Sequence, residues 1–154
     1  SVVREYVAIV AGRLQRKSGT FRSQLRTAKG LRRYSADEGE QGEDAVTHYG
    51  VERDLDRATL VRVTLETGRR NQIRVHFAEA GHPLAGDPLY GGEKKAKRLP
   101  AGEVRDAVEK LQRPALHSWR LTIDHPRTNE RMTFEAALPT DMTELLAVLR
   151  RAYA

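Results

Sequence analysis

Two neighbouring segments of the sequence carry side chains that could bind a phosphate or a nucleobase. The first segment runs from Glu66 to His76 and contains Arg69, Arg70, Gln72, Arg74 and His76. The second, from Gly81 to Gly92, is rich in glycine and proline. Guanidinium groups, an amide and the free N–H groups of a helix N-terminus together offer many donors to a phosphate or a base edge. This spacing therefore indicates anion or nucleic-acid binding, although an amphipathic helix with a solvated arginine face would show the same pattern.

Several other chemistries lack residues that they require. The absence of cysteine excludes disulfides, thiolate catalysis, iron–sulfur clusters and cysteine-based zinc sites. The glycines of residues 86–91 have the spacing of a phosphate loop, but Gly92-Glu93 stands where Lys-Ser/Thr is required. Ser118 is not surrounded by the glycines of a nucleophile elbow. No histidine pair has the helical spacing of a zinc protease. We therefore expect no metal site, no nucleotide triphosphatase and no nucleophile elbow.

Basic charge is concentrated near the beginning of the chain. The 27 Lys and Arg residues exceed the 21 Asp and Glu residues, which gives a net charge of +6. Residues 1–34 contain nine basic residues and one acidic residue, Glu5, and an acidic run follows at residues 37–44. A basic segment of this kind fits a polyanion whose binding weakens with salt. Nucleic acid is the predicted partner, and a protein that docks on the acidic run is an alternative.

The candidate residues need a scaffold of strands that brings them together. A chain of 154 residues is typical of one domain. Alternating or β-branched runs bounded by turn residues predict strands. These strands are expected over residues 2–10, 20–27, 45–52, 58–66, 116–123 and 132–136. Short turns join the third to the fourth and the fifth to the sixth, so the sheet should be mainly antiparallel.

Helices are expected between and after these strands. The 3.6-residue periodicity predicts a helix over residues 71–80 that ends at Gly81, with Ile73, Phe77 and Ala80 on one side. On this helix Gln72 and His76 share a face and Arg74 points elsewhere. Further helices are expected over residues 103–111 and 140–151. The fold class is thus α+β, a single domain over residues 1–154 with a mobile charged loop at 29–44 and a basic insertion at 93–113.

No apolar stretch reaches the roughly 18 to 20 residues that span a bilayer, and the N-terminus has no apolar signal-peptide core. We therefore expect a soluble, cytoplasmic protein. The first residues already read as a core strand, with no initiator methionine before Ser1. This start predicts that the chain is a piece of a longer polypeptide.

Several motifs resemble those of the RluA/RluD-type RNA pseudouridine synthases. They occur in the order that the family shows and cover nearly the whole chain. The motifs are Arg4-Glu-Tyr-Val-Ala-Ile-Val, Ala45-Val-Thr, Thr67-Gly-Arg-Arg-Asn-Gln-Ile-Arg-Val-His, Gly81-His-Pro, Gly86-Asp-Pro-Leu-Tyr-Gly, Leu116-His-Ser-Trp-Arg-Leu, His125-Pro and Phe134-Glu-Ala. The resemblance implies a pseudouridine synthase catalytic-domain fold and a monomer that acts on structured rRNA or tRNA.

The resemblance also implies a reaction and the roles of individual residues. These enzymes break the N1–C1′ bond of uridine, turn the base and rejoin it through C5, without metal or cofactor. Tyr6 corresponds to the tyrosine that packs against the target base, and Arg74 to the arginine that pairs with the catalytic aspartate. RNA contacts or support of the motif are expected from five further residues, Arg4, Arg69, Arg70, Gln72 and His76.

The catalytic aspartate of the family lies in an Arg-Leu-Asp motif upstream of the position of Tyr6. This sequence begins after that point, so we expect the chain alone to be inactive, with Arg74 facing an empty place. Asp56 has similar neighbours but follows Tyr6, in a predicted surface turn, and Asp87 is expected to serve as a turn or capping residue. The alternative function is a non-catalytic RNA-binding module on the same fold.

Overall fold

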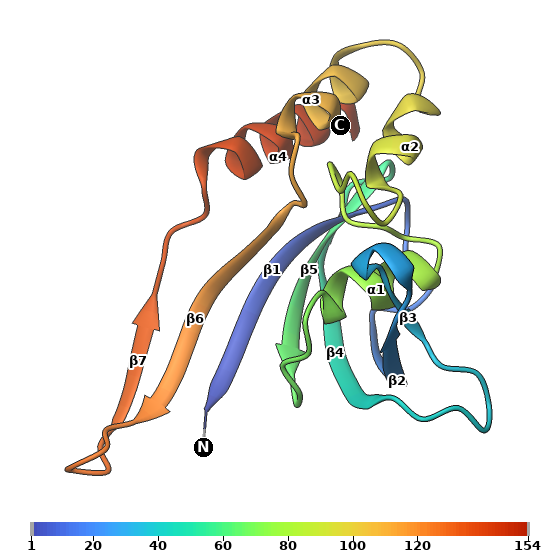
Figure 1. Ribbon diagram of the computed structural model, residues 1–154. Helices are drawn as coiled ribbons and strands as arrows, with labels where there is room; N and C mark the ends of the chain where they lie inside the picture. Colours follow the sequence, from blue (N-terminus) through green and yellow to red (C-terminus); the bar gives the residue numbers. More distant parts are fainter. Residues whose placement is uncertain (1, 154) are drawn as a thin grey trace.

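One seven-stranded antiparallel sheet forms the centre of the molecule (Figure 1). The computed structural model describes residues 2–153, apart from the side chain of Leu31. The strand order is β3-β2-β4-β5-β1-β6-β7. The strands are β1 (Val3–Ala11), β2 (Ser18–Thr27), β3 (Arg33–Ser35), β4 (Glu43–Asp54), β5 (Ala58–Leu65), β6 (Leu116–Asp124) and β7 (Arg131–Glu135). The α+β prediction is confirmed, and all six predicted strands are present within about two residues.

The middle strands are buried on both faces, because helices cover opposite sides of the sheet. The helices are η1 (Lys29–Leu31), α1 (Gln72–Glu79), α2 (Gly92–Lys97), α3 (Glu103–Leu111) and α4 (Thr140–Tyr153). Ala8 and Val10 of β1 face a cluster that includes Phe77 of α1. Ile9, which points the other way as strand geometry requires, packs in a cluster that includes Leu145 of α4. The site residues on β1 and α1 therefore rest on a two-sided core.

Helix α1 follows its prediction closely but is buried more broadly. It ends before Gly81, whose positive φ of 88° suits glycine. Ile73 and Phe77 are buried as expected, whereas Ala80 is exposed, which corrects that part of the prediction. The reason is that α1 packs against both the sheet and the loop that follows it. Val75 lies in a cluster with Leu25 and Tyr90, and Gln72 and His76 both contact the hydroxyl of Thr47.

The segment 29–44 is not a loop throughout, contrary to expectation. It contains η1 and β3, and β3 pairs with the end of β2 through Leu25 and Ser35. The Arg33 side chain is buried and donates to Glu43 over 2.6 Å. The strand pairing and the ion pair each join residues ten positions apart, so the composition of the segment did not reveal them.

The segment 93–113 is also more than a basic insertion. It forms most of α2 and all of α3, and three of its apolar residues, Ala96, Val108 and Leu111, lie in the same core cluster as Ile9. The four lysines of the segment are exposed. Among the described residues, no helix is both long and apolar enough to cross a membrane.

Candidate active site

Arg74 and Asp87 form the most buried ion pair of the site. Nε and Nη2 of Arg74 donate to the two carboxylate oxygens of Asp87, each over 2.8 Å. Asp87 is fully buried, and the Arg74 side chain is 20% exposed. Bidentate, charge-assisted pairs of this kind hold both side chains in one geometry. Arg74 thus presents a fixed cation at the surface of α1.

Asp87 is held in turn by its own loop. Its Oδ1 accepts from the backbone N–H groups of Leu89 and Tyr90, over 2.9 and 3.1 Å. The loop closes tightly, because a Cβ at Gly92 would lie only 1.9 Å from the carbonyl oxygen of Leu84. Burial opposes ionisation of Asp87, but Arg74 and the two N–H groups outweigh it and lower the pKa of Asp87 below its usual 3.8. The carboxylate is therefore ionised at neutral pH.

This pair corrects one expectation and extends another. Arg74 does not face an empty place, because Asp87 of the same chain occupies one edge of its guanidinium. Asp87 does cap backbone groups, as expected, but it is also the partner of Arg74. A third donor of Arg74, on Nη1, reaches Oδ1 of Asn71 over 3.1 Å. Of the five guanidinium N–H groups, two remain for a second anion.

Tyr90 connects this pair to the turn between β2 and β3. Its ring is almost completely buried, and its hydroxyl accepts from the backbone N–H of Arg33 over 2.9 Å and from Nδ2 of Asn71 over 3.3 Å. The guanidinium carbon of Arg74 lies 5.0 Å from the ring centroid, and that of Arg32 lies 5.1 Å from it. Two cations from distant segments therefore share one aromatic ring.

Gln72 and His76 form a polar network inside the fold. Gln72 is 2% exposed and His76 is 3% exposed. The Gln72 amide accepts from Thr67 and donates to Thr47, and the two ring nitrogens of His76 contact the hydroxyls of Thr47 (2.7 Å) and Ser23 (2.8 Å). This burial corrects the expectation of direct RNA contacts for Gln72 and His76. They support the motif by tying α1 to the sheet.

We predict that His76 makes stability depend on pH. Burial lowers the pKa of His76 below its usual 6.5, and Glu79 only partly offsets this. The unfolded chain therefore takes up a proton first as pH falls below about 6.5, so the free energy of unfolding should decrease from pH 7.5 to pH 5.5. Urea unfolding should show this decrease in the parent and a smaller one in His76→Gln. The same substitution at His125 is the control, and an equal change in both variants would contradict the prediction.

Tyr6 lies on β1, on the face of the sheet that α1 covers. It is half-buried and packs against the cluster that contains Ile73 and Phe77 of α1. A β-bulge with β6 occurs at this point, because Glu5 pairs with Arg120 and Tyr6 with Ser118. Bulges are frequent beside active sites, where they redirect a side chain. The structure therefore places Tyr6 at a local irregularity on the same face as the helix that carries Arg74.

The three other predicted RNA-binding arginines, Arg4, Arg69 and Arg70, lie on the surface around the end of β5. Nε of Arg69 donates to the carbonyl oxygen of Asp44 over 2.8 Å, and its Nη1 lies 3.7 Å from Glu43. The guanidinium of Arg4 passes close to Gly68, since a Cβ there would lie 3.3 Å from it. Arg70 is exposed. The fold thus groups the three arginines around one loop, although the partners of Arg69 leave it less available than its position suggests.

Comparison with known proteins decides the family. The family described as RNA pseudouridylate synthase matches residues 1–79, which is half of the chain. The chain belongs to this family. Among curated relatives, it is 39% identical over 150 residues to "Ribosomal large subunit pseudouridine synthase D" of Nitrosomonas europaea, and 40% identical over 154 residues to the protein of that name from Vibrio vulnificus.

Solved structures agree with the family. "Human RNA Pseudouridylate Synthase Domain Containing 4" is 21% identical and superposes with a TM-score of 0.69, over 97% of this chain and 62% of that one. "Human RNA Pseudouridylate Synthase Domain Containing 1" is 25% identical, with a TM-score of 0.63, over 97% of this chain and 66% of that one. The curated relatives are longer. The alignments cover 97% and 98% of this chain, but only 42% and 46% of the Nitrosomonas and Vibrio proteins.

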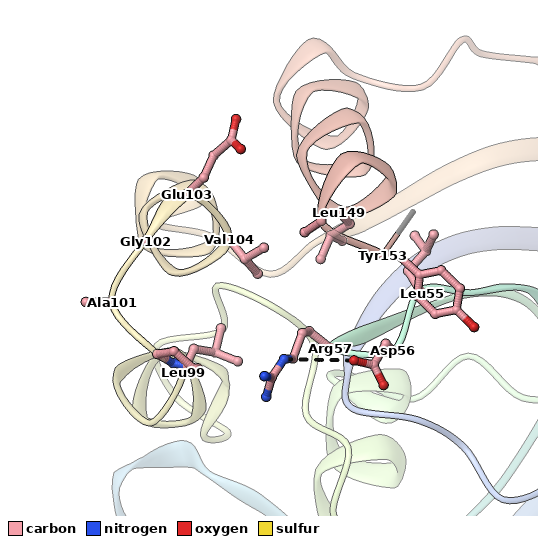
Figure 2. Close-up of a pocket in the computed structure, with 12 residues that line it drawn as sticks. Leu55, Asp56, Arg57, Leu99, Ala101, Gly102, Glu103, Val104, Leu149 and Tyr153 are labelled. Atoms are coloured by element: carbon pink, nitrogen blue, oxygen red, sulfur yellow. Dashed lines mark ion pairs between the residues drawn. The ribbon is translucent and has the colours of Figure 1, made fainter.

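Asp56 does not have the surroundings of a catalytic carboxylate. It lies in the turn between β4 and β5 with a positive φ of 64°, at the edge of a pocket of about 350 Å³ lined by Leu55, Leu149 and Tyr153 (Figure 2). It is more than half exposed, and its carboxylate oxygens lie 3.9 Å from Nε of Arg57 and 4.0 Å from Nη2 of Arg13. These weak surface pairs fit the expected role in a turn.

Sequence reasoning missed Asn71 and Tyr90 and the pairing role of Asp87. All three lie within the segments 66–76 and 81–92, and the polar and glycine-rich composition of these segments was the only sequence signal for them. Their contacts depend on a loop that returns to α1 after thirteen residues, from Arg74 to Asp87. A loop has no periodicity from which such a contact can be predicted.

Proposed function

We propose that this chain is part of an RNA pseudouridine synthase that isomerises uridine in structured RNA. In the reaction the N1–C1′ bond breaks, the base turns, and a C5–C1′ bond forms; C5 loses a proton and N1 gains one. Because the relatives are named for the large ribosomal subunit, large-subunit rRNA is the first substrate to test, with tRNA as the second. We also propose that the protein is a cytoplasmic monomer that acts without metal or cofactor.

The roles of the residues follow from the resemblance and the geometry together. Tyr6 packs against the flipped base and takes part in removal of the C5 proton. Arg74 keeps the catalytic carboxylate ionised and in place. That carboxylate belongs to the Arg-Leu-Asp motif that precedes the tyrosine in the family. The exposed arginines around the end of β5 bind the flanking phosphates and help to offset the few kcal/mol that base flipping costs.

The fixed Arg74 is the observation that supports this proposal most directly. A lone arginine near a carboxylate would lose side-chain entropy when the pair forms. Here Asp87 and Asn71 already hold the guanidinium, and two N–H groups remain for a second carboxylate. A cation fixed before the reaction costs little reorganisation when charge develops beside it. This arrangement suits catalysis better than a purely structural ion pair at the surface.

The test is conversion of uridine in a large-subunit rRNA transcript by the full-length protein, read by mass spectrometry of the digested RNA. We predict that Tyr6→Phe lowers the rate about 10²-fold while RNA affinity is retained, because the ring still stacks but the hydroxyl is lost. Full activity of Tyr6→Phe would reduce Tyr6 to a packing role. RNA binding by the parent protein without any product would favour the non-catalytic RNA-binding module.

A further inference from the structure

Arg32 is a second cation beside the Arg74–Asp87 pair, and it comes from a segment far away in the sequence. It lies at the turn between β2 and β3, and its guanidinium carbon is 5.1 Å from the centroid of the Tyr90 ring. Arg74 contacts the same ring at 5.0 Å. In Figure 1 the turn before β3 lies beside α1. The fold therefore brings Arg32 to the candidate active site.

The backbone fixes the position of Arg32 from both sides. Its carbonyl oxygen accepts from the N–H of Ala28 over 2.8 Å, which closes the turn. The N–H of the next residue, Arg33, donates to the buried Tyr90 hydroxyl over 2.9 Å. Gly30 allows this turn through its positive φ of 81°. The backbone at Arg32 is thus held in place, and its exposed side chain lies over the Tyr90 ring.

The two arginines differ in whether a carboxylate neutralises their charge. Asp87 neutralises Arg74 through two hydrogen bonds. In the part of the chain that the structure describes, Arg32 has the Tyr90 ring as its side-chain partner and no carboxylate. An exposed guanidinium held on an aromatic ring keeps its fork of N–H donors available, and a phosphate accepts two of them at once. The site therefore offers a positive charge without a carboxylate partner on the same aromatic ring that Arg74 contacts.

We propose that Arg32 binds a backbone phosphate of the RNA beside the target nucleotide. The proposal rests on the proposed function, since it assumes that RNA enters the site at Arg74 and Tyr6. A phosphate contact positions the RNA without reading its sequence, so Arg32 acts on affinity and register, not on the chemical step. Its place on the Tyr90 ring sets the distance from that phosphate to Arg74.

The experiment measures Kd for a large-subunit rRNA transcript at several salt concentrations, together with kcat at saturating RNA, in the full-length protein. Arg32→Ala should raise Kd roughly tenfold and reduce the slope of log Kd against log salt by about one, with kcat changed less than about twofold. Arg32→Lys should keep most of the salt slope but not the full affinity, because a lysine lacks the fork. The matched control is Lys29→Ala, which removes one charge from the same turn.

The measured affinities of the two alanine variants decide whether Arg32 binds a phosphate. A larger loss of affinity for Arg32→Ala than for Lys29→Ala supports the proposal. Equal effects of both variants would mean that only the charge of the turn matters, and an unchanged Kd would exclude a phosphate contact; either result overturns the proposal. A loss of kcat without a loss of affinity also overturns it. Whether the parent forms pseudouridine is a separate readout, so a failure of the proposed function is distinguishable from a failure of the role of Arg32.

Discussion

Replacing Arg74 by alanine in the full-length protein is expected to lower kcat for pseudouridine formation by at least about 10²–10³-fold, with little change in RNA affinity. Arg74 offers two free N–H groups beyond those bound to Asp87 and Asn71. Removal of a preorganised donor beside developing charge typically costs this much. The measurement is single-turnover formation of pseudouridine in a large-subunit rRNA transcript, with Kd determined in parallel.

The control must separate catalysis from folding. Arg74→Ala leaves Asp87 buried without its partner, so part of the protein could unfold. The double variant Arg74→Ala/Asp87→Ala removes both charges and should fold better than the single variant while remaining as slow. If Arg74→Ala reduced RNA affinity as strongly as kcat, Arg74 would be a binding residue and its proposed role would be wrong.

Asp87→Ala is expected to destabilise the fold by about 3–5 kcal/mol, which is the usual cost of removing one partner of a buried ion pair. Asp87 is fully buried, accepts from two backbone N–H groups as well as from Arg74, and lies in a loop without room for adjustment at Gly92. Urea unfolding at pH 7 measures the change. Asp87→Asn should cost less, because an amide oxygen can still accept from the backbone.

Two comparisons test the origin of this effect. Asp56→Asn, which removes an exposed charge with weak partners and tolerates the positive φ of this position, should change stability by no more than about 0.5 kcal/mol. The pKa of Asp87 is lowered in the folded state, so its contribution should be complete above the usual carboxyl pKa and disappear as pH falls through the folded value, in the acid range below about pH 4. An Asp87→Ala variant as stable as Asp56→Asn would contradict the prediction.

The strands and the longer helices were largely predictable from the sequence. β1, β5 and α1 have strong β-branched or 3.6-residue patterns, and each appears within about two residues of its predicted bounds. The missing elements, β3 and α2, are short and polar. They are held by partners outside the element itself, such as Glu43 for Arg33 and the core around Ile9 for Ala96. Such contacts leave no local pattern.

The sequence by itself determined the fold class, the family and the positions of Tyr6 and Arg74 in their elements, because periodicity and motif order are properties of the chain. Only the tertiary structure decided what these residues contact. It buried Gln72 and His76 in the network with Thr47, and it joined Arg74 to Asp87. It also brought Arg32 onto the ring of Tyr90. The physical reason is that a buried polar group must find a partner wherever the fold provides one, and that partner can be far away in the sequence.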